Sequence, residues 1–376
     1  MKVLYISEFF FEVNGANKLS MMHWKTLKDI CGEENVLTIA LTGGEFINDK
    51  KYITFRSYKS RYEKMKNFMQ LNNSRINNKI ICEIINIIEF NNIDVVFIDN
   101  STYGRLAKII KKKDQSIKVI SFYHDIKRNL SKQWLKKYGV KYFPDYIVTQ
   151  YNEYLNSRYS DINITLNKRE SDLLFKYYKK KTSLELPIYM KESNEIKNID
   201  IKDDSFKILF VGAYYYPNVE GLRWFCKNVV PYINKKCCLY VIGKGMEVLK
   251  AELECESVKV IGEVEDISYF YNISDSVIAP IFDGAGMKVK TAEAFMFGKK
   301  FIGSSESLVG YIENVQVKLL NKSVFLANKP SEYINAIEFL YENRNDNKID
   351  ENIRQVYRDN YSDISAFNKL KEIMIK

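Results

Sequence analysis

The residues best suited to chemistry in this chain of 376 amino acids lie within the segment 276–303. An apolar run there leads into a glycine-rich turn, Asp283-Gly284-Ala285-Gly286-Met287, and a segment compatible with a helix follows. A strand that feeds such a turn at the start of a helix directs free backbone N–H groups and the positive helix end at one point. This pattern predicts a phosphate-binding site.

Charged side chains occur at helical spacing behind this turn. Glu293 lies one to two turns inside the expected helix, and Lys290 is three residues before it on the same face. A carboxylate at that place suits the hydroxyl pair of a ribose. Together these residues predict a clamp for a nucleoside diphosphate. An ordinary strand–turn–helix connection is the alternative, and for a lone glycine turn it would be the better interpretation.

Three further glycine patterns come before this clamp in a fixed order. They are 206–225, which contains Gly212 and Asn218 as a helix cap, then 238–245, and then 258–266. From about residue 206 to 310 this order resembles the C-terminal domain of the group 1 (family 4) glycosyltransferases, which are retaining nucleotide-sugar enzymes of the GT-B fold. Each motif alone is weak, but the ordered set is specific.

Apolar strand candidates alternate with helical segments through both halves of the chain. The expected strands are 2–6, 36–41, 52–55, 95–99, 119–123, 146–149, 162–166, 207–211, 239–242, 258–261, 277–280, 300–302 and 324–327. Buried strands that alternate with helices indicate parallel sheets covered on both faces. The resemblance implies an α/β protein of the GT-B fold, with two doubly wound Rossmann-like domains facing across a cleft.

The chain is long enough for two domains, because single cores stop growing at about 250–300 residues. We expect an N-terminal Rossmann-like acceptor-side domain over 1–190 and a polar linker over 191–205. A C-terminal Rossmann-like domain over 206–360 is expected to bind the nucleotide-sugar donor. The segment 361–376 has apolar residues at helical spacing, and the resemblance implies that this helix packs back on the N-terminal domain.

Two N-terminal segments are expected at the same site. The resemblance implies a glycine-rich loop near the donor phosphates at Gly15-Ala16, where an ordinary turn is the alternative. His124 and Asp125 follow a strand and match a His-Asp pair that contacts the donor sugar in this family, although a lone histidine is more often structural. Asp125 is expected to orient His124 or to approach the acceptor hydroxyl. We interpret the other histidine, His23, as structural.

The donor half departs from the family pattern at two places. Many members carry an arginine and a lysine where this chain has Ala213 and Asn218, and the first glutamate of their Glu-x7-Glu pattern is Ala285 here. The diphosphate charge must then be met by lysines and the helix N-terminus. The expected catalytic residues are His124, Asp125, Lys288 and Glu293. The expected donor-binding residues are Gly15, Ala16, Gly212, Asn218, Lys244, Val264, Gly284, Ala285, Gly286, Met287, Lys288, Lys290 and Glu293.

The sequence predicts neither a metal nor a separate cofactor. No two aspartates have the D-x-D spacing with which nucleotide-sugar enzymes of the other common fold hold a metal ion. We expect a UDP-linked sugar donor whose departing diphosphate is stabilised by N–H groups and lysines. Six cysteines without C-x-x-C spacing, two histidines and no long apolar run indicate a cytoplasmic protein without a zinc site or disulfide framework.

The positive charge belongs to the first half. Residues 1–200 hold 34 Lys and Arg against 23 Asp and Glu, and the whole chain has a net charge of +10. This excess predicts an anionic partner, with a solvated lysine-rich surface as the alternative. Segments 56–69 and 127–143 combine cations with aromatic residues or methionines, as in peripheral binding to the anionic inner face of the plasma membrane. An apolar stripe on a helix is also typical of core.

The leading hypothesis is a metal-independent glycosyltransferase that retains anomeric configuration. It would move a sugar from a nucleotide diphosphate to a glycan, a lipid-linked acceptor or a protein-linked acceptor. A sugar-nucleotide epimerase is one alternative, and a non-catalytic GT-B subunit that positions an acceptor for a partner enzyme is another. No nucleic-acid partner is expected, since no such module is recognisable. A homo-oligomer is left open.

Overall fold

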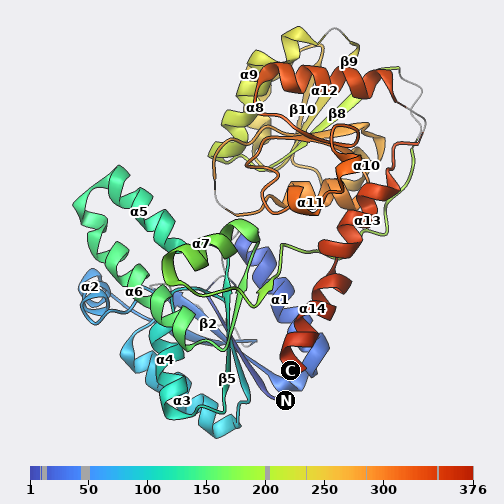
Figure 1. The fold of residues 1–376 in the computed structure, drawn as a ribbon. Helices are drawn as coiled ribbons and strands as arrows, with labels where there is room; N and C mark the ends of the chain where they lie inside the picture. Colours follow the sequence, from blue (N-terminus) through green and yellow to red (C-terminus); the bar gives the residue numbers. More distant parts are fainter. Residues whose placement is uncertain are drawn as a thin grey trace. The chain divides into compact units, whose positions relative to one another are not determined.

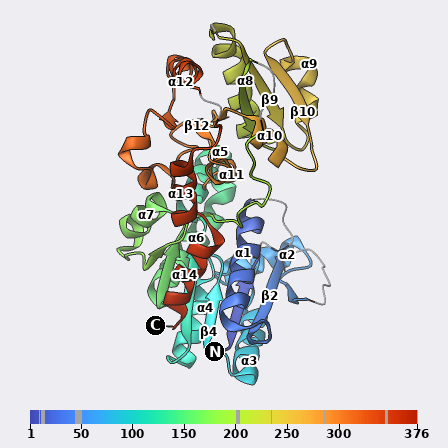
Figure 2. The same cartoon turned by 90° about the vertical axis from the view of Figure 1, so that its right-hand side faces the viewer.

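The computed structural model describes residues 1–8, 10, 15–43, 51–199, 204–233, 235–284, 286–344 and 347–375. The chain divides into two compact units (Figure 1 and Figure 2). The first unit contains Met1–Pro187 and Ala366–Lys376, and the second contains Ile188–Ser365. The chain therefore passes between the units twice.

The first unit is built on a seven-stranded parallel sheet in the order β3-β2-β1-β4-β5-β6-β7. The strands are β1 Val3–Ser7, β2 Val36–Gly43, β3 Ile53–Arg56, β4 Val95–Ile98, β5 Lys118–Tyr123, β6 Ile162–Thr165 and β7 Leu184–Glu185. Every residue of β1 and β4 is buried, as expected for central strands with helices on both faces. The strand order reverses between β1 and β4, and open α/β sheets bind ligands at such a switch point.

Helices follow the strands of this sheet in the described residues that precede 188. They are α1 Gly15–Cys31, α2 Arg61–Met69, α3 Asn78–Asn91, α4 Gly104–Lys113, α5 Lys127–Tyr138, α6 Phe143–Tyr159 and α7 Lys168–Tyr178. Isoleucines of α3 and α4 form the main core with β1, β2, β4 and β5. The backbones of α4 and α6 lie in direct contact, because a Cβ at Gly104 would lie only 2.0 Å from the Asn152 carbonyl oxygen.

One predicted strand is wrong. The segment 146–149 lies inside α6 and forms no strand. Its short apolar run has the composition of a strand, but Pro144 at the start of the helix and Asp145 in the first turn favour a helix that begins just before it. The two-residue strand β7 was not predicted, because it is too short to have a period.

The second unit has a six-stranded parallel sheet in the order β10-β9-β8-β11-β12-β13. The strands are β8 Phe206–Val211, β9 Cys237–Ile242, β10 Val258–Gly262, β11 Ser276–Ala279, β12 Lys300–Gly303 and β13 Val324–Leu326. Its order also reverses once, between β8 and β11. The predicted α/β class with two doubly wound parallel sheets is therefore confirmed.

The α-helices of the second unit are α8 Tyr216–Asn228, α9 Lys250–Leu253, α10 Ser268–Ile273, α11 Val289–Met296, α12 Pro330–Glu342 and α13 Glu351–Asn360. The last helix, α14 Asp363–Ile375, begins in the second unit, and its residues from Ala366 onward belong to the first. Leu370 and Met374 of α14 are buried, and the Lys118 ammonium donates to the Ile373 carbonyl over 2.7 Å. This helix therefore completes the packing of the first unit.

The segment expected to be a linker packs on the second unit over its described residues 191–199. Glu192 pairs with Arg354 at 2.5 Å and with Arg358 at 3.3 Å. The Lys197 amide donates to Asn272 Oδ1 over 3.0 Å. No helix in the described ranges has the length and apolar character needed to cross a bilayer.

Candidate functional site

Three strand ends of the second unit come together through glycines. The Gly212 amide donates to the Ile242 carbonyl at 2.9 Å, and the Gly243 amide donates to the Gly262 carbonyl at 2.8 Å. Gly243 has φ of 141°, and a Cβ there would lie 2.1 Å from the Gly212 carbonyl oxygen. A side chain is excluded at this position. The carboxyl edge of the sheet at β8 and β9 therefore presents bare backbone.

Lys290 extends from α11 to this edge. Its ammonium donates to Asn218 Oδ1 over 2.7 Å and lies 4.3 Å from the centroid of the Phe210 ring. A Cβ at Gly212 would lie only 2.8 Å from the same ammonium. Lys290 has a relative exposure of 8%. The glycine thus leaves the space in which a buried cation lies over the end of β8.

The surroundings of Lys290 disfavour its charged form. Burial lowers the pKa of Lys290 to about 7, and Lys288 adds to this effect while Glu293 opposes it. An anion placed beside the ammonium would raise this pKa again, because it stabilises the charged form. Near neutral pH this lysine can therefore take up a proton when an anion binds.

Lys288 lies just before α11 and has a different environment. Its ammonium pairs with Glu306 at 3.1 Å and donates to the Gly286 carbonyl at 3.1 Å. The Tyr311 hydroxyl donates to the Lys288 carbonyl at 2.9 Å. Glu306 compensates the charge of Lys288, so the two lysines are not equivalent.

Glu293 is half-buried on α11, where its carboxylate accepts a hydrogen bond of 3.2 Å from the Tyr271 hydroxyl. The Tyr271 ring stacks on Phe297, with centroids 4.6 Å apart and planes 7° apart. Burial raises the pKa of Tyr271 well above its ordinary value, and the charge of Glu293 acts in the same direction. Tyr271 therefore stays a hydrogen-bond donor that helps to orient the carboxylate.

The predicted cap role of Asn218 is wrong. Helix α8 begins at Tyr216, so Asn218 lies within its first turn. Its side-chain amide instead donates to the Ala213 carbonyl over 2.8 Å while its oxygen accepts from Lys290. Asn218 thus connects the loop after β8 to α11, which a sequence reading of helix caps does not reveal.

The remaining predicted donor-binding residues lie in the second unit or at the start of α1. Lys244 is exposed, and its carbonyl accepts from the Tyr214 amide over 2.8 Å. Val264 is half-buried in the loop that follows β10. Gly284 and Gly286 have positive φ and Met287 is buried, whereas Ala285 lies outside the described residues. Gly15 and Ala16 open α1, and their further surroundings are outside the described part.

A buried carboxylate lies at the switch point of the first unit. Asp99 follows β4 and is 0% exposed. Its Oδ1 accepts from His124 Nε2 at 3.0 Å and from His23 Nδ1 at 3.2 Å. Its Oδ2 accepts from the Tyr5 hydroxyl at 2.7 Å and from the Ser20 hydroxyl. Burial alone would raise the pKa of Asp99, but the two histidines hold it well below its ordinary value.

This cluster was only partly predicted. His124 was expected at the site, and the structure places it on Asp99, which no prediction named. His23 shares that carboxylate, and burial lowers the pKa of His23. The available signal was the position of Asp99 directly after a buried strand, where the carboxyl ends of parallel strands meet. His23, 76 residues before Asp99 in the sequence, gave no such signal.

Two more carboxylates hold the loops around this point. Glu8, after β1, accepts from Asn100 at 2.7 Å and from the Tyr103 hydroxyl at 2.6 Å. Glu153 accepts from the backbone amides of Lys127 at 2.8 Å and Arg128 at 3.0 Å. Burial raises the pKa of Glu153 to about 7. The amino end of α5 is thus already occupied by a protein carboxylate.

Asp125 interacts electrostatically with Lys127 and with Glu170. Its Oδ1 is buried, with no hydrogen-bond partner among the described residues. The neighbouring cation Lys127 also pairs with Glu8 at 3.3 Å. The expected roles of Asp125 remain predictions.

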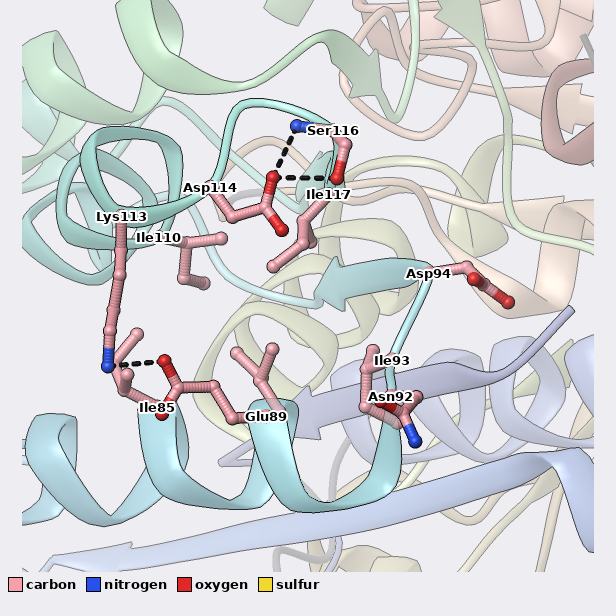
Figure 3. A pocket seen from close by; sticks show the side chains of 11 residues that line it. Ile85, Glu89, Asn92, Ile93, Asp94, Ile110, Lys113, Asp114, Ser116 and Ile117 are labelled. Atoms are coloured by element: carbon pink, nitrogen blue, oxygen red, sulfur yellow. Dashed lines mark hydrogen bonds and ion pairs between the residues drawn. The ribbon is translucent and has the colours of Figure 1, made fainter.

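A cavity of about 630 Å³ lies between α3 and α4 at the amino ends of β4 and β5, at the other end of these strands from Asp99 (Figure 3). Figure 3 shows Lys113 paired with Glu89, at 2.5 Å, and Asp114 bound to Ser116. Its charged groups are therefore largely satisfied within the protein, and it lies where β4 and β5 begin. Across the described ranges, no group of three or more His, Cys, Asp or Glu could hold a metal ion.

Comparison with known proteins places the second unit in a family. Residues 205–343 match the family model described as "Glycosyl transferases group 1". Comparison with curated protein sequences gives no match. The chain therefore contains a group 1 glycosyltransferase domain, as the order of its glycine motifs predicts.

Solved structures share the fold of the whole chain. The apo form of the lipopolysaccharide outer core galactosyltransferase WaaB has a TM-score of 0.71 at 12% identity, over 100% of this chain and 99% of that one. HepE from Anabaena, in complex with UDP, has a TM-score of 0.69 at 12% identity over 100% of both chains. A glycosyltransferase from Rickettsia africae has a TM-score of 0.67 at 14% identity, over 99% and 97%. The predicted GT-B fold is confirmed.

Proposed function

We propose that this chain is a retaining glycosyltransferase that transfers a sugar from a UDP-linked donor without a metal ion. One observation carries the proposal. A buried lysine, Lys290, lies next to Gly212 at the carboxyl end of β8, where the strand order of the sheet reverses. This sheet belongs to the domain that matches the group 1 family model. Bare backbone next to a cation is a suitable environment for a diphosphate.

The diphosphate would lie at the carboxyl edge of β8 and β9, with Lys290 and the start of α11 as its positive partners. As the sugar leaves, negative charge grows on the diphosphate, and these fixed groups stabilise that charge. Lys288 contributes less, since Glu306 already compensates its ammonium. The structures of HepE with UDP and with UDP-glucose support a UDP-linked donor for this chain.

Glu293 would accept the ribose hydroxyls, and its contact with Tyr271 supports a fixed carboxylate position. His124 would contact the donor sugar from the first unit. Its ring is held by Asp99, which supports a defined orientation of the imidazole. Asp125 would approach the acceptor hydroxyl.

The acceptor would be a glycan, a lipid-linked sugar or a protein-linked sugar bound by the first unit. WaaB is described as a lipopolysaccharide outer core galactosyltransferase, which supports a saccharide acceptor. The positive charge of residues 1–200 supports a cytoplasmic location, with activity at the anionic inner face of the membrane.

A non-catalytic GT-B subunit is the second candidate. It is favoured by Ala285 at the first position of the Glu-x7-Glu pattern and by Ala213 where many members have arginine. The two functions differ in one measurement. An enzyme releases UDP from UDP-sugar when incubated with acceptor-containing membrane extract, whereas a binding subunit leaves the donor intact.

Glu293→Gln tests the donor clamp. The substitution keeps the size but removes a charge-assisted hydrogen bond worth about 1.5–3 kcal/mol, so UDP should bind at least about tenfold more weakly in calorimetry. The variant and the wild type should bind 2′-deoxy-UDP with more similar affinities, because one ribose hydroxyl is missing. Glu313→Gln, at an exposed glutamate of the same unit, is the matched control. Unchanged UDP affinity in Glu293→Gln would contradict the assignment.

A further inference from the structure

A second cavity, of about 990 Å³, opens on the first unit where α2, α5 and the start of α6 meet. Its walls include large apolar side chains that are partly exposed. Met65 is 56% exposed, Phe143 53% and Trp134 40%. The two stretches that the sequence analysis singled out separately, 56–69 and 127–143, thus line one cavity. Exposed apolar surface gathered in a hollow is typical of a binding site.

The aromatic wall of this cavity has a defined geometry. The rings of Trp134 and Tyr142 meet edge to face, with centroids 6.2 Å apart. Tyr142 in turn lies 5.3 Å from Tyr138, centroid to centroid. These contacts fix the Trp134 and Tyr142 rings in a lining that also contains Met65, Phe68 and Met69, and such an apolar lining suits a hydrocarbon chain.

Cations dominate the charged groups of the lining. Arg61, Lys64 and Lys141 line the cavity, and Asp145 is the carboxylate among its lining residues. Burial raises the pKa of Asp145, although Lys127 and Lys64 oppose this effect. The Lys141 ammonium lies 5.6 Å from the Tyr142 ring centroid, next to the apolar wall. An apolar interior with a positive excess is complementary to an amphiphile with an anionic head.

We propose that this cavity binds the hydrocarbon chain of a lipid phosphate, with the phosphate held by Arg61, Lys64 and Lys141. This proposal rests on the proposed function in one respect. It narrows the acceptor from the three proposed classes to the lipid-linked class. Binding itself requires no transfer reaction and can be measured separately.

The test uses the full chain and dodecyl phosphate below its critical micelle concentration. Dodecyl maltoside carries the same chain without charge, and inorganic phosphate carries the charge without the chain. In calorimetry, dodecyl phosphate should bind at least tenfold more tightly than either. Equal binding of dodecyl maltoside would overturn the role of the cations, and equal binding of inorganic phosphate would overturn the role of the cavity.

Variants locate the binding. Met65→Glu and Phe143→Glu place a carboxylate in the cavity at positions where the native side chains are exposed, and each should weaken dodecyl phosphate binding at least tenfold. Phe90→Glu changes a side chain that is 87% exposed on α3, away from the cavity, and should change the affinity less than twofold. Lys64→Glu should weaken binding more than Lys132→Glu, at an exposed lysine of α5 outside the lining.

Two results would overturn the proposal. One is wild-type affinity in both cavity variants, and the other is no binding of dodecyl phosphate to the wild type. UDP affinity measured on the same samples separates this proposal from the proposed function. Weak UDP binding with normal dodecyl phosphate binding contradicts the donor site alone, whereas the reverse contradicts the lipid site alone.

Discussion

Lys290→Met should weaken UDP binding by one to two orders of magnitude at pH 7. Methionine is similar in length and is apolar, but it removes the ammonium that lies over the Phe210 ring and next to Gly212. A hydrogen bond to a charged group contributes about 1.5–3 kcal/mol, which corresponds to this loss. Calorimetry with UDP and uridine checks it, because uridine lacks the phosphates and should bind both proteins alike. Equal losses for both ligands would indicate general damage to the second unit.

The same lysine predicts a pH dependence. Its pKa is about 7 in the free protein and rises when a diphosphate binds, so binding takes up a proton above pH 7. UDP affinity should therefore fall as the pH rises from 7 to 9, by up to tenfold per unit. Lys290→Met should lose this dependence, whereas Lys244→Met, at an exposed lysine near the same edge, should keep it. Proton uptake that is the same in wild type and Lys290→Met would contradict the assignment.

Lys290 also affects stability in a defined direction. Its folded pKa of about 7 lies below the ordinary value of 10.5, so the unfolded chain binds the extra proton between these values. The free energy of unfolding should gain a positive contribution as the pH rises through this window. Urea unfolding of Lys290→Met should lack that contribution.

Asp99→Asn should lower the free energy of unfolding of the first unit by about 3–5 kcal/mol, the range found when one partner of a buried charged pair is removed. Asparagine keeps the shape, but its NH2 group faces donors in either orientation. These are the two histidines at the Oδ1 position or the Tyr5 and Ser20 hydroxyls at the Oδ2 position. Urea unfolding followed by circular dichroism measures the loss. Asp172→Asn removes an exposed ion pair with Lys168 and should cost under 1 kcal/mol.

Acid provides a second check on Asp99. Its folded pKa is well below the ordinary carboxyl value, so its stabilising contribution is complete above about pH 4 and is lost as the pH falls further. The wild type should therefore lose stability on acidification below pH 4 more steeply than Asp99→Asn. Parallel acid profiles would show that the ionised carboxylate does not stabilise the cluster.

The sequence predicted most strands and the glycine turns that follow β8 and β11, because both depend on local patterns. Buried parallel strands are continuous apolar runs, and the turns around Gly212 and Gly284 interrupt them at recognisable places. The segment 146–149 fails for the same reason, since a short run of tyrosine, isoleucine, valine and threonine fits a strand and a helix equally well. A neighbouring proline was the better guide there.

What the sequence could not provide are contacts made at long range. Nothing near Lys290 in the chain indicates that its ammonium reaches Asn218, 72 residues away, or that burial moves its pKa to about 7. Asp99 likewise joins two histidines that are 76 and 25 residues distant. Such groupings arise only when parallel strands bring their carboxyl ends to one edge.

The return of the chain through α14 has a consequence for the order of folding during synthesis. The first unit is made first, yet Leu370 and Met374, which are buried in it, are added only after the whole second unit. Domains generally fold in the order in which they are made. Here the second unit can complete its core while the first still lacks a helix. A fragment that ends at residue 362 keeps α13 but lacks α14, and it should therefore resist protease within residues 205–343 more strongly than within residues 1–187.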